Sequence, residues 1–116
     1  MPYVCSDPDE YNDGQHHGES QECVALVKEA CGISGSFTNT AKKGVLVKGT
    51  NVAKGAAIAT FNASGHYEGH AAIYLGQTAD GILVLDQWKG HGAQQRVIRY
   101  GGNGVSNNGN GFYVVN

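Results

Sequence analysis

The sequence predicts an α+β fold in which one helix is followed by an antiparallel sheet. Apolar residues recur at clear helical spacing in one stretch, which ends at Gly32. From Ala57 onward, short β-rich segments alternate with Gly, Asn and Asp. Glycine makes up 18 of the 116 residues without a Gly-X-Y period, which is about twice its usual share of roughly 7%. This glycine content favours short strands joined by tight turns.

The composition predicts a single small domain spanning residues 1–116 and excludes several functions. The net charge is −2, and 41% of the residues are hydrophobic, enough to bury a core. Lys and Arg number only 8, too few for a surface that follows phosphates, so we expect no nucleic-acid partner. The longest strongly apolar run, residues 82–85, is four residues long, whereas a membrane span needs about twenty. We therefore expect no membrane insertion.

The first part of the chain is expected to hold one helix between irregular segments. Residues 1–19 are polar and rich in turn signals, without the basic and apolar regions of a secretory signal, so we expect synthesis in the cytoplasm and an irregular arm. Ser20 is the predicted N-cap, and Gly32 ends the helix. Residues 33–55 are interrupted by Gly, Ser, Thr and Asn, and are predicted to be mostly loop.

Five strands are predicted after this loop, over residues 58–61, 70–75, 82–88, 96–100 and 112–115. The last two are joined by residues 101–111, which are rich in Gly and Asn. We interpret this connection as a flexible surface loop. The alternative is a lip that lines a substrate site, because loops also carry binding residues.

The three cysteines are Cys5, Cys23 and Cys31, an odd number without a C-x-x-C pair. This pattern argues against a zinc ribbon and leaves at least one free thiol. Cys23 lies near the predicted helix start, where the macrodipole favours a thiolate, as a nucleophile requires. The alternative is a small buried hydrophobic residue, and this alternative fits Cys31 better.

A thiolate nucleophile needs a histidine beside it, and His70 is the best candidate because it alone begins a clean strand. Its side chain would share a face with residues 72 and 74, whereas residues 71, 73 and 75 would face the core. Pairing Tyr74 with Ile82 places His70 opposite Asp86, and a register shift of one residue places it opposite Gln87. We favour Asp86, because a carboxylate orients the imidazole and stabilises its charged form. The alternative for His70 is an ordinary exposed residue of the strand, and the alternative for Asp86 is a solvated carboxylate.

Two further features leave alternatives open. Trp88 is either a core residue or a wall of the substrate cleft. His66 and His70 form an H-x₃-H pair, but the pair falls in a turn and a strand, without H-E-x-x-H or paired cysteines. We therefore expect no metal site and no cofactor.

Three segments together resemble a known family: QECVALV at 21–27, GHAAIYLG at 69–76 and VLDQW at 84–88. They are similar to the NlpC-like and CHAP papain-fold amidases that cut bacterial cell-wall peptides, and more narrowly to the small amidase effectors of type VI secretion systems. The chain departs from the family pattern at Glu22, where Asp or Gln is usual, and lacks the Ser-Gly that is common after the cysteine.

The resemblance implies a papain-like fold and a peptidoglycan cysteine endopeptidase or amidase. Cys23 would be the nucleophile, His70 the general base and Asp86 the orienting residue. Tyr11 lies twelve residues before Cys23, near the place of an active-site tyrosine in NlpC-like enzymes, and Gln87 and Trp88 would orient or bind substrate. The D-Ala–diaminopimelate cross-link is the favoured bond, and the γ-D-Glu–diaminopimelate bond is the alternative. An enzyme acting on another acyl substrate and a catalytically idle wall-binding domain stay open.

The resemblance also implies partners and a site of action. The partners would be a peptidoglycan peptide, the secretion machinery and a cognate immunity protein. Export by a non-Sec route would bring the protein to the periplasm of target bacteria. There Cys5 and Cys31 could form a disulfide, but we favour a buried Cys31 with a separate Cys5.

Overall fold

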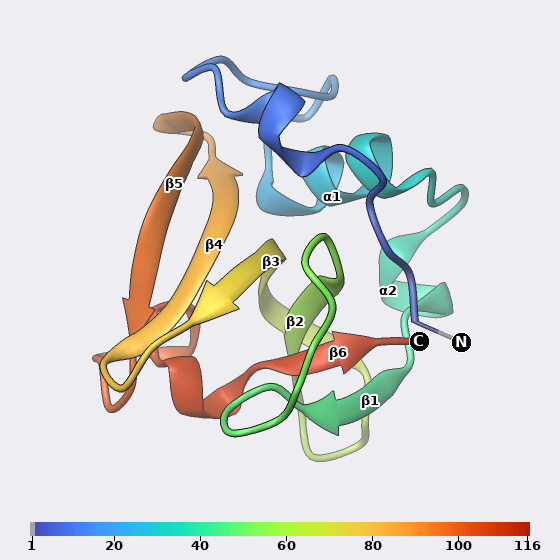
Figure 1. Cartoon of the computed structure of the whole chain (residues 1–116). Coiled ribbons are helices and arrows are strands. Elements are labelled where there is room, and N and C mark those ends of the chain that lie inside the picture. Colours follow the sequence, from blue (N-terminus) through green and yellow to red (C-terminus); the bar gives the residue numbers. More distant parts are fainter. Residues whose placement is uncertain (1) are drawn as a thin grey trace.

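The structure, a computed structural model, describes residues 2–116. A six-stranded sheet lies at its centre, with the strand order β1-β6-β2-β3-β4-β5, and every neighbouring pair is antiparallel. The strands are β1 (Lys43–Leu46), β2 (Ala57–Phe61), β3 (Tyr67–Gln77), β4 (Gly81–Trp88), β5 (His91–Arg99) and β6 (Tyr113–Val115). The helices are α1 (Cys23–Cys31), α2 (Phe37–Thr40) and the 3₁₀ turns η1 (Pro8–Tyr11), η2 (Val105–Asn107) and η3 (Gly109–Gly111). Helix α1 and the N-terminal arm lie together beside the sheet (Figure 1).

Helix α1 begins later than the sequence predicts. The predicted N-cap Ser20 is wrong, because Gln21 adopts a positive φ of 61° and interrupts the helical conformation. Glu22 is the N-cap instead, which makes Cys23 the first helical residue. The predicted end is confirmed: Gly32 has a φ of 67° and its backbone N–H donates to the carbonyl of Lys28.

The segment predicted to be mostly loop contains two short elements, α2 and β1. Phe37, only 3% exposed, anchors α2 in the core. Strand β1 pairs with the C-terminal strand β6, for example through Lys43 and Val115. Each element has only four residues and depends on contacts distant in the sequence, so local periodicity does not reveal it.

The five predicted strands are present, but the register predicted between β3 and β4 is wrong. Tyr74 pairs with Val84 rather than Ile82, and Ile82 pairs with Gln77. The cause is a loop of only residues 78–80 together with an irregularity between Tyr74 and Gly76. Because the shift at Tyr74 is two residues, every side chain keeps its face. Asp86 therefore stays on the face that carries His70.

Both faces of the sheet are buried, not only the face of residues 71, 73 and 75. One core packs α1 against that face, through residues such as Leu26, Ile73 and Leu85. The second core covers the opposite face, where Ala72 and Tyr74 join Phe112 from the C-terminal segment. His70 lies on this second face and is 5% exposed, so it is not an exposed strand residue.

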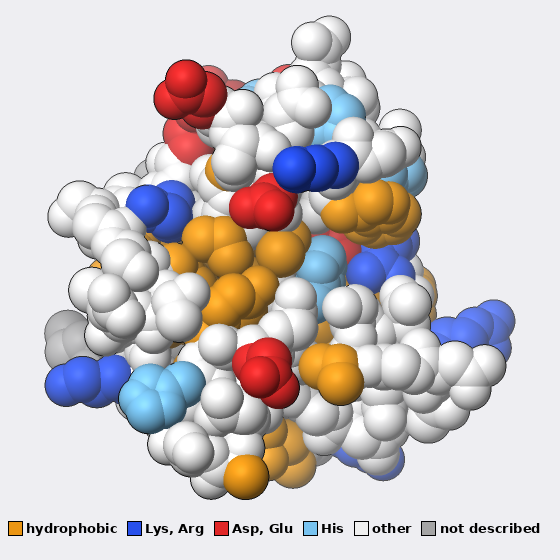
Figure 2. Space-filling view, turned by 180° about the vertical axis from the view of Figure 1, so that it is seen from behind, with side chains coloured by type: hydrophobic (Ala, Val, Ile, Leu, Met, Phe, Trp, Pro, Cys, Tyr) orange, Lys and Arg blue, Asp and Glu red, His pale blue; other side chains and the backbone are white. Residues whose placement is uncertain are grey.

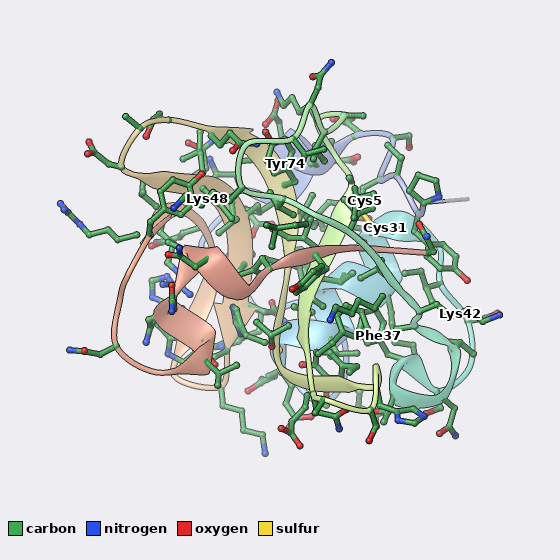
Figure 3. The ribbon with its side chains drawn as sticks, turned by 90° about the horizontal axis from the view of Figure 1, so that it is seen from below. Cys5, Cys31, Phe37, Lys42, Lys48 and Tyr74 are labelled. Carbon is green, nitrogen blue, oxygen red and sulfur yellow. A yellow bond between two sulfur atoms is a disulfide. The ribbon has the colours of Figure 1, made fainter. Side chains whose placement is uncertain are left out.

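A disulfide joins Cys5 of the N-terminal arm to Cys31 at the end of α1 (Figure 3). The favoured interpretation of a separate Cys5 is therefore wrong. The arm is held against the start of β2, because the Cys5 N–H donates to the Gly55 carbonyl at 2.7 Å and Val4 bridges to Ala56. This attachment brings Cys5 to Cys31 and leaves Cys23 as the free thiol.

Across residues 2–116, none of the helices has the length and apolar character needed to cross a bilayer.

Candidate active site

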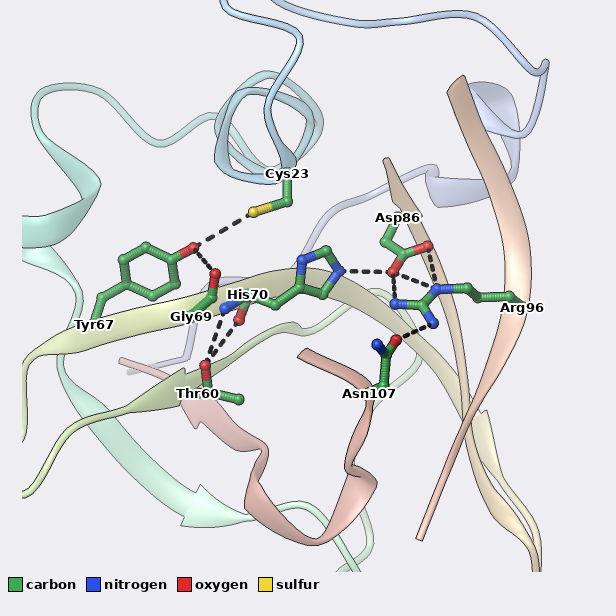
Figure 4. Close-up of polar contacts among 8 residues, drawn as sticks. All are labelled: Cys23, Thr60, Tyr67, Gly69, His70, Asp86, Arg96 and Asn107. Atoms are coloured by element: carbon green, nitrogen blue, oxygen red, sulfur yellow. Dashed lines mark hydrogen bonds and ion pairs between the residues drawn. The ribbon is translucent and has the colours of Figure 1, made fainter. Parts of the chain in front are cut away.

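Cys23 lies at the head of α1, partly exposed, with its side chain directed toward β3 (Figure 4). As the first helical residue, it has a backbone N–H without an intrahelical partner, and the positive end of the macrodipole is next to its sulfur. Both features favour negative charge at this position. The later helix start therefore places the thiol closer to the end of the dipole than the sequence predicts.

His70, a residue of β3, lies beside Cys23 and is held from two sides. Its Nε2 contacts Asp86 Oδ2 at 2.7 Å, and its backbone N–H donates to Thr60 Oγ1 at 3.0 Å. The other ring nitrogen, Nδ1, faces the side of Cys23 (Figure 4). The structure therefore brings together the three residues predicted as nucleophile, base and orienting acid.

The electrostatics of the site favour a thiolate–imidazolium pair. Burial raises the pKa of the Cys23 thiol, but its interaction with the His70 side chain, aided by Tyr67 and the Ala71 backbone, brings the pKa below its ordinary value. Burial also lowers the pKa of His70, whereas the hydrogen bond to Asp86 and the interaction with Cys23 raise it to about 9. Each charged group thus stabilises its partner's charge.

Asp86 is fully buried and has a second partner, Arg96 of β5, which the sequence analysis missed. Arg96 Nε donates to Asp86 Oδ2 at 2.8 Å and Oδ1 at 3.0 Å, and its Nη1 donates to Asn107 Oδ1 at 3.1 Å. Burial raises the pKa of Asp86, but the hydrogen bonds from His70 and Arg96 lower it overall. Once the β4–β5 pairing is known, strand alternation places residues 84, 86 and 96 on one face and so predicts this contact.

Gln87 is also fully buried, and its hydrogen bonds hold the segment that leads into α1. Its Nε2 donates to the carbonyls of Glu22 at 2.9 Å and His17 at 2.7 Å, and its Oε1 accepts from the His17 N–H at 2.8 Å. Adjacent strand residues point to opposite faces. Gln87 therefore reaches α1 while Asp86 reaches His70.

A tyrosine does contact the thiol, but it is Tyr67 of β3 and not Tyr11. The Tyr67 hydroxyl lies 3.4 Å from Cys23 Sγ and donates to the Gly69 carbonyl at 3.3 Å (Figure 4). Tyr11 instead packs edge-on against His17, with ring centroids 4.9 Å apart. Tyr67 and His70 are three residues apart, so strand alternation predicts opposite faces and hides their proximity.

An open cleft of about 660 Å³ reaches the thiol. Its lining includes Cys23, Val24, Phe37, Tyr67, His70 and Trp88. Trp88 is 41% exposed and forms a wall of the cleft rather than part of the core. Ser106 of η2 also lines the cleft, so the connection 101–111 contributes a lip. On the face turned away from the view of Figure 1, hydrophobic side chains gather in a hollow with charged groups around it (Figure 2).

No group of three His, Cys, Asp or Glu side chains suited to hold a metal ion occurs within residues 2–116. The polar groups around the thiol are the His70 imidazole, the Asp86 carboxylate behind it and the Tyr67 hydroxyl. The chemistry that this arrangement can perform is attack of a thiolate on an acyl group, with proton transfer by an imidazole.

Comparison with known proteins finds one family over nearly the whole chain. Residues 1–115 match the family described as domesticated amidase effector 2. The chain is 43% identical to "Domesticated amidase effector 2" of Ixodes scapularis, covering 96% of this chain and 82% of that protein. It is 33% identical to "Type VI secretion amidase effector 2 protein" of Salmonella typhi, covering 99% of both.

A solved structure shares the fold. "Type 6 secretion amidase effector 2 (Tae2)" superposes with a TM-score of 0.85 at 31% identity, covering 97% of this chain and 93% of that one. The predicted α+β, papain-like fold and the predicted resemblance to the small amidase effectors of type VI secretion are thus confirmed.

Proposed function

Because this chain belongs to the domesticated amidase effector 2 family, we propose that it is a cysteine amidase that hydrolyses peptide bonds of peptidoglycan. The observation that supports this proposal most directly is the Cys23 thiol at the head of α1, beside a His70 imidazole that Asp86 holds at 2.7 Å. The relatives named above are amidase effectors. A thiolate–imidazolium pair at an open cleft supplies the chemistry that amide hydrolysis needs.

The proposed reaction has two stages. The Cys23 thiolate attacks the amide carbonyl carbon, a C–S bond forms, and the carbonyl electron pair moves to oxygen, where the Cys23 backbone N–H stabilises it. His70 then gives its proton to the leaving amine as the C–N bond breaks. In the second stage His70 takes a proton from water, and the water oxygen attacks the thioester carbon. The C–S bond then breaks, which releases the acid and restores the Cys23 thiolate beside the charged His70. Asp86 stabilises the charged imidazole in both stages.

The lining of the cleft suits a charged peptide. Its floor is apolar near the thiol, through Val24 and Phe37, and two cations, Lys28 and Lys89, line it together with one acid, Glu22. Stem peptides of the bacterial wall carry several carboxylates, which these lysines can pair with. Among their bonds we favour the D-Ala–diaminopimelate cross-link over the γ-D-Glu–diaminopimelate bond, a choice that rests on the family resemblance.

The proposed route of delivery and site of action rest on the names of the relatives. Two of them are effectors of type VI secretion, and we extend delivery by that machinery, with action in the periplasm of target cells, to this chain. A cognate immunity protein that covers the cleft in the producing cell is part of the same proposal. Binding of such a protein would depend on Trp88, an exposed aromatic residue of the cleft wall.

Digestion of purified Gram-negative peptidoglycan tests the proposal. Wild type and Cys23→Ala are incubated with the same sacculi, and the released muropeptides are identified by mass spectrometry. We expect wild type alone to remove cross-linked dimers, which names the bond. Loss of γ-D-Glu–diaminopimelate linkages instead would show that the protein is an amidase but that the favoured bond is wrong. An unchanged muropeptide profile with wild type would contradict the proposed function.

A further inference from the structure

We propose that Tyr67 is a further catalytic residue, whose phenol hydroxyl donates a hydrogen bond to the oxygen that becomes negatively charged when Cys23 attacks a carbonyl. This inference rests on the proposed function, because it concerns the same site and the same reaction class. It adds a side-chain donor to the backbone N–H of Cys23 and so completes an oxyanion hole.

The position of the Tyr67 hydroxyl supports this role. Its oxygen lies 3.4 Å from Cys23 Sγ, the atom that forms the new bond. In the tetrahedral intermediate, the charged oxygen is attached to the carbon that the sulfur has just bonded. That oxygen can therefore lie within hydrogen-bond distance of a hydroxyl that already contacts the sulfur. In the resting site the same hydroxyl can donate to the Gly69 carbonyl at 3.3 Å or to the Cys23 sulfur, and its single hydrogen can turn toward the oxyanion when that stronger acceptor forms.

The ring of Tyr67 is held in place by packing. It meets the Phe37 ring edge-on, with centroids 5.0 Å apart and planes at 89°, an arrangement that aromatic pairs favour. Phe37 itself is buried at 3% exposure. The hydroxyl is thus presented to the cleft from a fixed ring, as preorganised stabilisation of an oxyanion requires.

An irregular stretch of β3 brings Tyr67 and His70 to the same sulfur. The β2–β3 pairing is interrupted between Ala59 and Phe61, opposite this stretch. Gly69 has a φ of 110°, which side-chain-bearing residues rarely adopt. Thr60 stabilises the irregular backbone, since its Oγ1 donates to the Glu68 carbonyl and accepts from the His70 N–H. A regular strand would separate the two side chains onto opposite faces.

The state of the phenol agrees with a donor role. Burial and the nearby charge of Cys23 raise the pKa of Tyr67 far above its ordinary value. The phenol therefore keeps its proton through the reaction. Tyr67 forms and breaks no covalent bond in this proposal, and His70 alone transfers protons.

Two reagents that attack the same thiol separate oxyanion stabilisation from thiol activation. Acylation of Cys23 by p-nitrophenyl acetate passes through a tetrahedral oxyanion, whereas alkylation by iodoacetamide displaces iodide without one. Both rates are measured in wild type and Tyr67→Phe across pH, so that they are compared per thiolate, with Cys23→Ala as background. Tyr113→Phe, which alters a tyrosine of β6 packed edge-on against Phe61, is the matched control.

We expect Tyr67→Phe to slow acylation on the order of 10²-fold while alkylation per thiolate changes less than about 3-fold. The Tyr113→Phe control should change neither rate. Equal effects of Tyr67→Phe on both reagents, or no effect on acylation, would overturn the inference. Unchanged melting by circular dichroism and a retained alkylation rate show that the Phe variant is folded.

The ester assay does not depend on wall peptides, so the two proposals can fail separately. If wild type leaves peptidoglycan intact but Tyr67→Phe slows acylation selectively, the proposed function fails and the role of Tyr67 stands. If wild type digests peptidoglycan and is acylated at the same rate as Tyr67→Phe, only the role of Tyr67 fails.

Discussion

Asp86 and Gln87 are consecutive residues of β4, and each holds a different partner of the candidate site. Asp86 contacts His70 Nε2 at 2.7 Å, whereas Gln87 Nε2 donates to the carbonyl of Glu22, the residue before Cys23, at 2.9 Å. The two side chains leave opposite faces of one strand. A single dipeptide thus sets the position of the His70 imidazole relative to the start of α1, where Cys23 lies.

Loss of the Gln87 amide should therefore displace Cys23. Gln87→Leu keeps the approximate volume but leaves the Glu22 and His17 carbonyls and the His17 N–H without their partner. Unsatisfied groups of this kind cost about 2 to 3 kcal/mol together. We expect urea denaturation to show a loss of that size and the rate of Cys23 alkylation to fall.

The control for this change is Gln95→Leu, which alters an exposed glutamine of the edge strand β5. It should change the free energy of unfolding by less than about 0.5 kcal/mol. A Gln87→Leu variant with wild-type stability and wild-type alkylation would contradict the positioning role.

The pH dependence of hydrolysis should follow the Cys23–His70 pair. The pKa of the thiol is lowered and that of His70 is raised to about 9, so the charged pair exists between these two ionisations. We expect kcat/KM to rise as the thiol ionises and to fall as the pH passes about 9. The two limbs belong to the pair rather than to single residues.

Asp86→Asn should move the alkaline limb to lower pH, because Asp86 raises the pKa of His70. The raised pKa of His70 also makes the stability of the fold decrease at high pH. A folded-state pKa above the unfolded value of 6.5 contributes stability that is complete below 6.5 and is lost as the pH rises through about 9. Asp86→Asn should therefore make the loss of stability between pH 6.5 and about 9 smaller than in wild type. An alkaline limb that stays in place would contradict the assignment of Asp86.

The disulfide should contribute a measurable part of the stability. Cys5 and Cys31 are 26 residues apart in the sequence, and closing a loop of this length stabilises a fold by about 3 kcal/mol. We expect the double variant Cys5→Ser, Cys31→Ser to lose that amount in urea denaturation. Dithiothreitol should lower the stability of wild type to the same level and leave the double variant unchanged. Equal stability of oxidised and reduced wild type would contradict the prediction.

Some features of the site follow from local sequence patterns. The placement of Cys23 near a helix start and of His70 on a strand follows from hydrophobic periodicity and from the helix stop at Gly32, which can be identified without a structure. Asp86 kept its face although the predicted register was wrong, since the error was two residues. The helix that ends before Gly32 can be predicted from such patterns. The later strands can be predicted in the same way.

Other features depend on irregular backbone, which periodicity cannot predict. The positive φ of Gln21 moves the helix start to Cys23. The irregular stretch around Gly69 brings Tyr67 to the thiol. Arg96 is found only once the β4–β5 pairing is known. The Cys5–Cys31 bond needs the arm to be folded onto β2, a contact between distant segments.

The irregular stretch of β3 can be tested with a matched pair of glycines. Gly65 and Gly69 both have positive φ, 81° and 110°. A Cβ at Gly65 would meet open space, whereas a Cβ at Gly69 would collide with Thr60 Oγ1 and would lie 2.6 Å from Val105 Cγ1. Gly65→Ala thus measures the backbone strain alone, about 1 to 2 kcal/mol, without touching the site.

Gly69→Ala should cost more than Gly65→Ala in urea denaturation, because the collision adds to the strain. It should also move Thr60, which accepts from the His70 N–H at 3.0 Å, and so disturb both Tyr67 and His70. We therefore expect Gly69→Ala to reduce peptidoglycan hydrolysis at least about 10-fold, since small displacements of reacting groups slow reactions strongly, whereas Gly65→Ala keeps wild-type activity. Equal activities of the two variants would show that the conformation at Gly69 does not position the catalytic side chains.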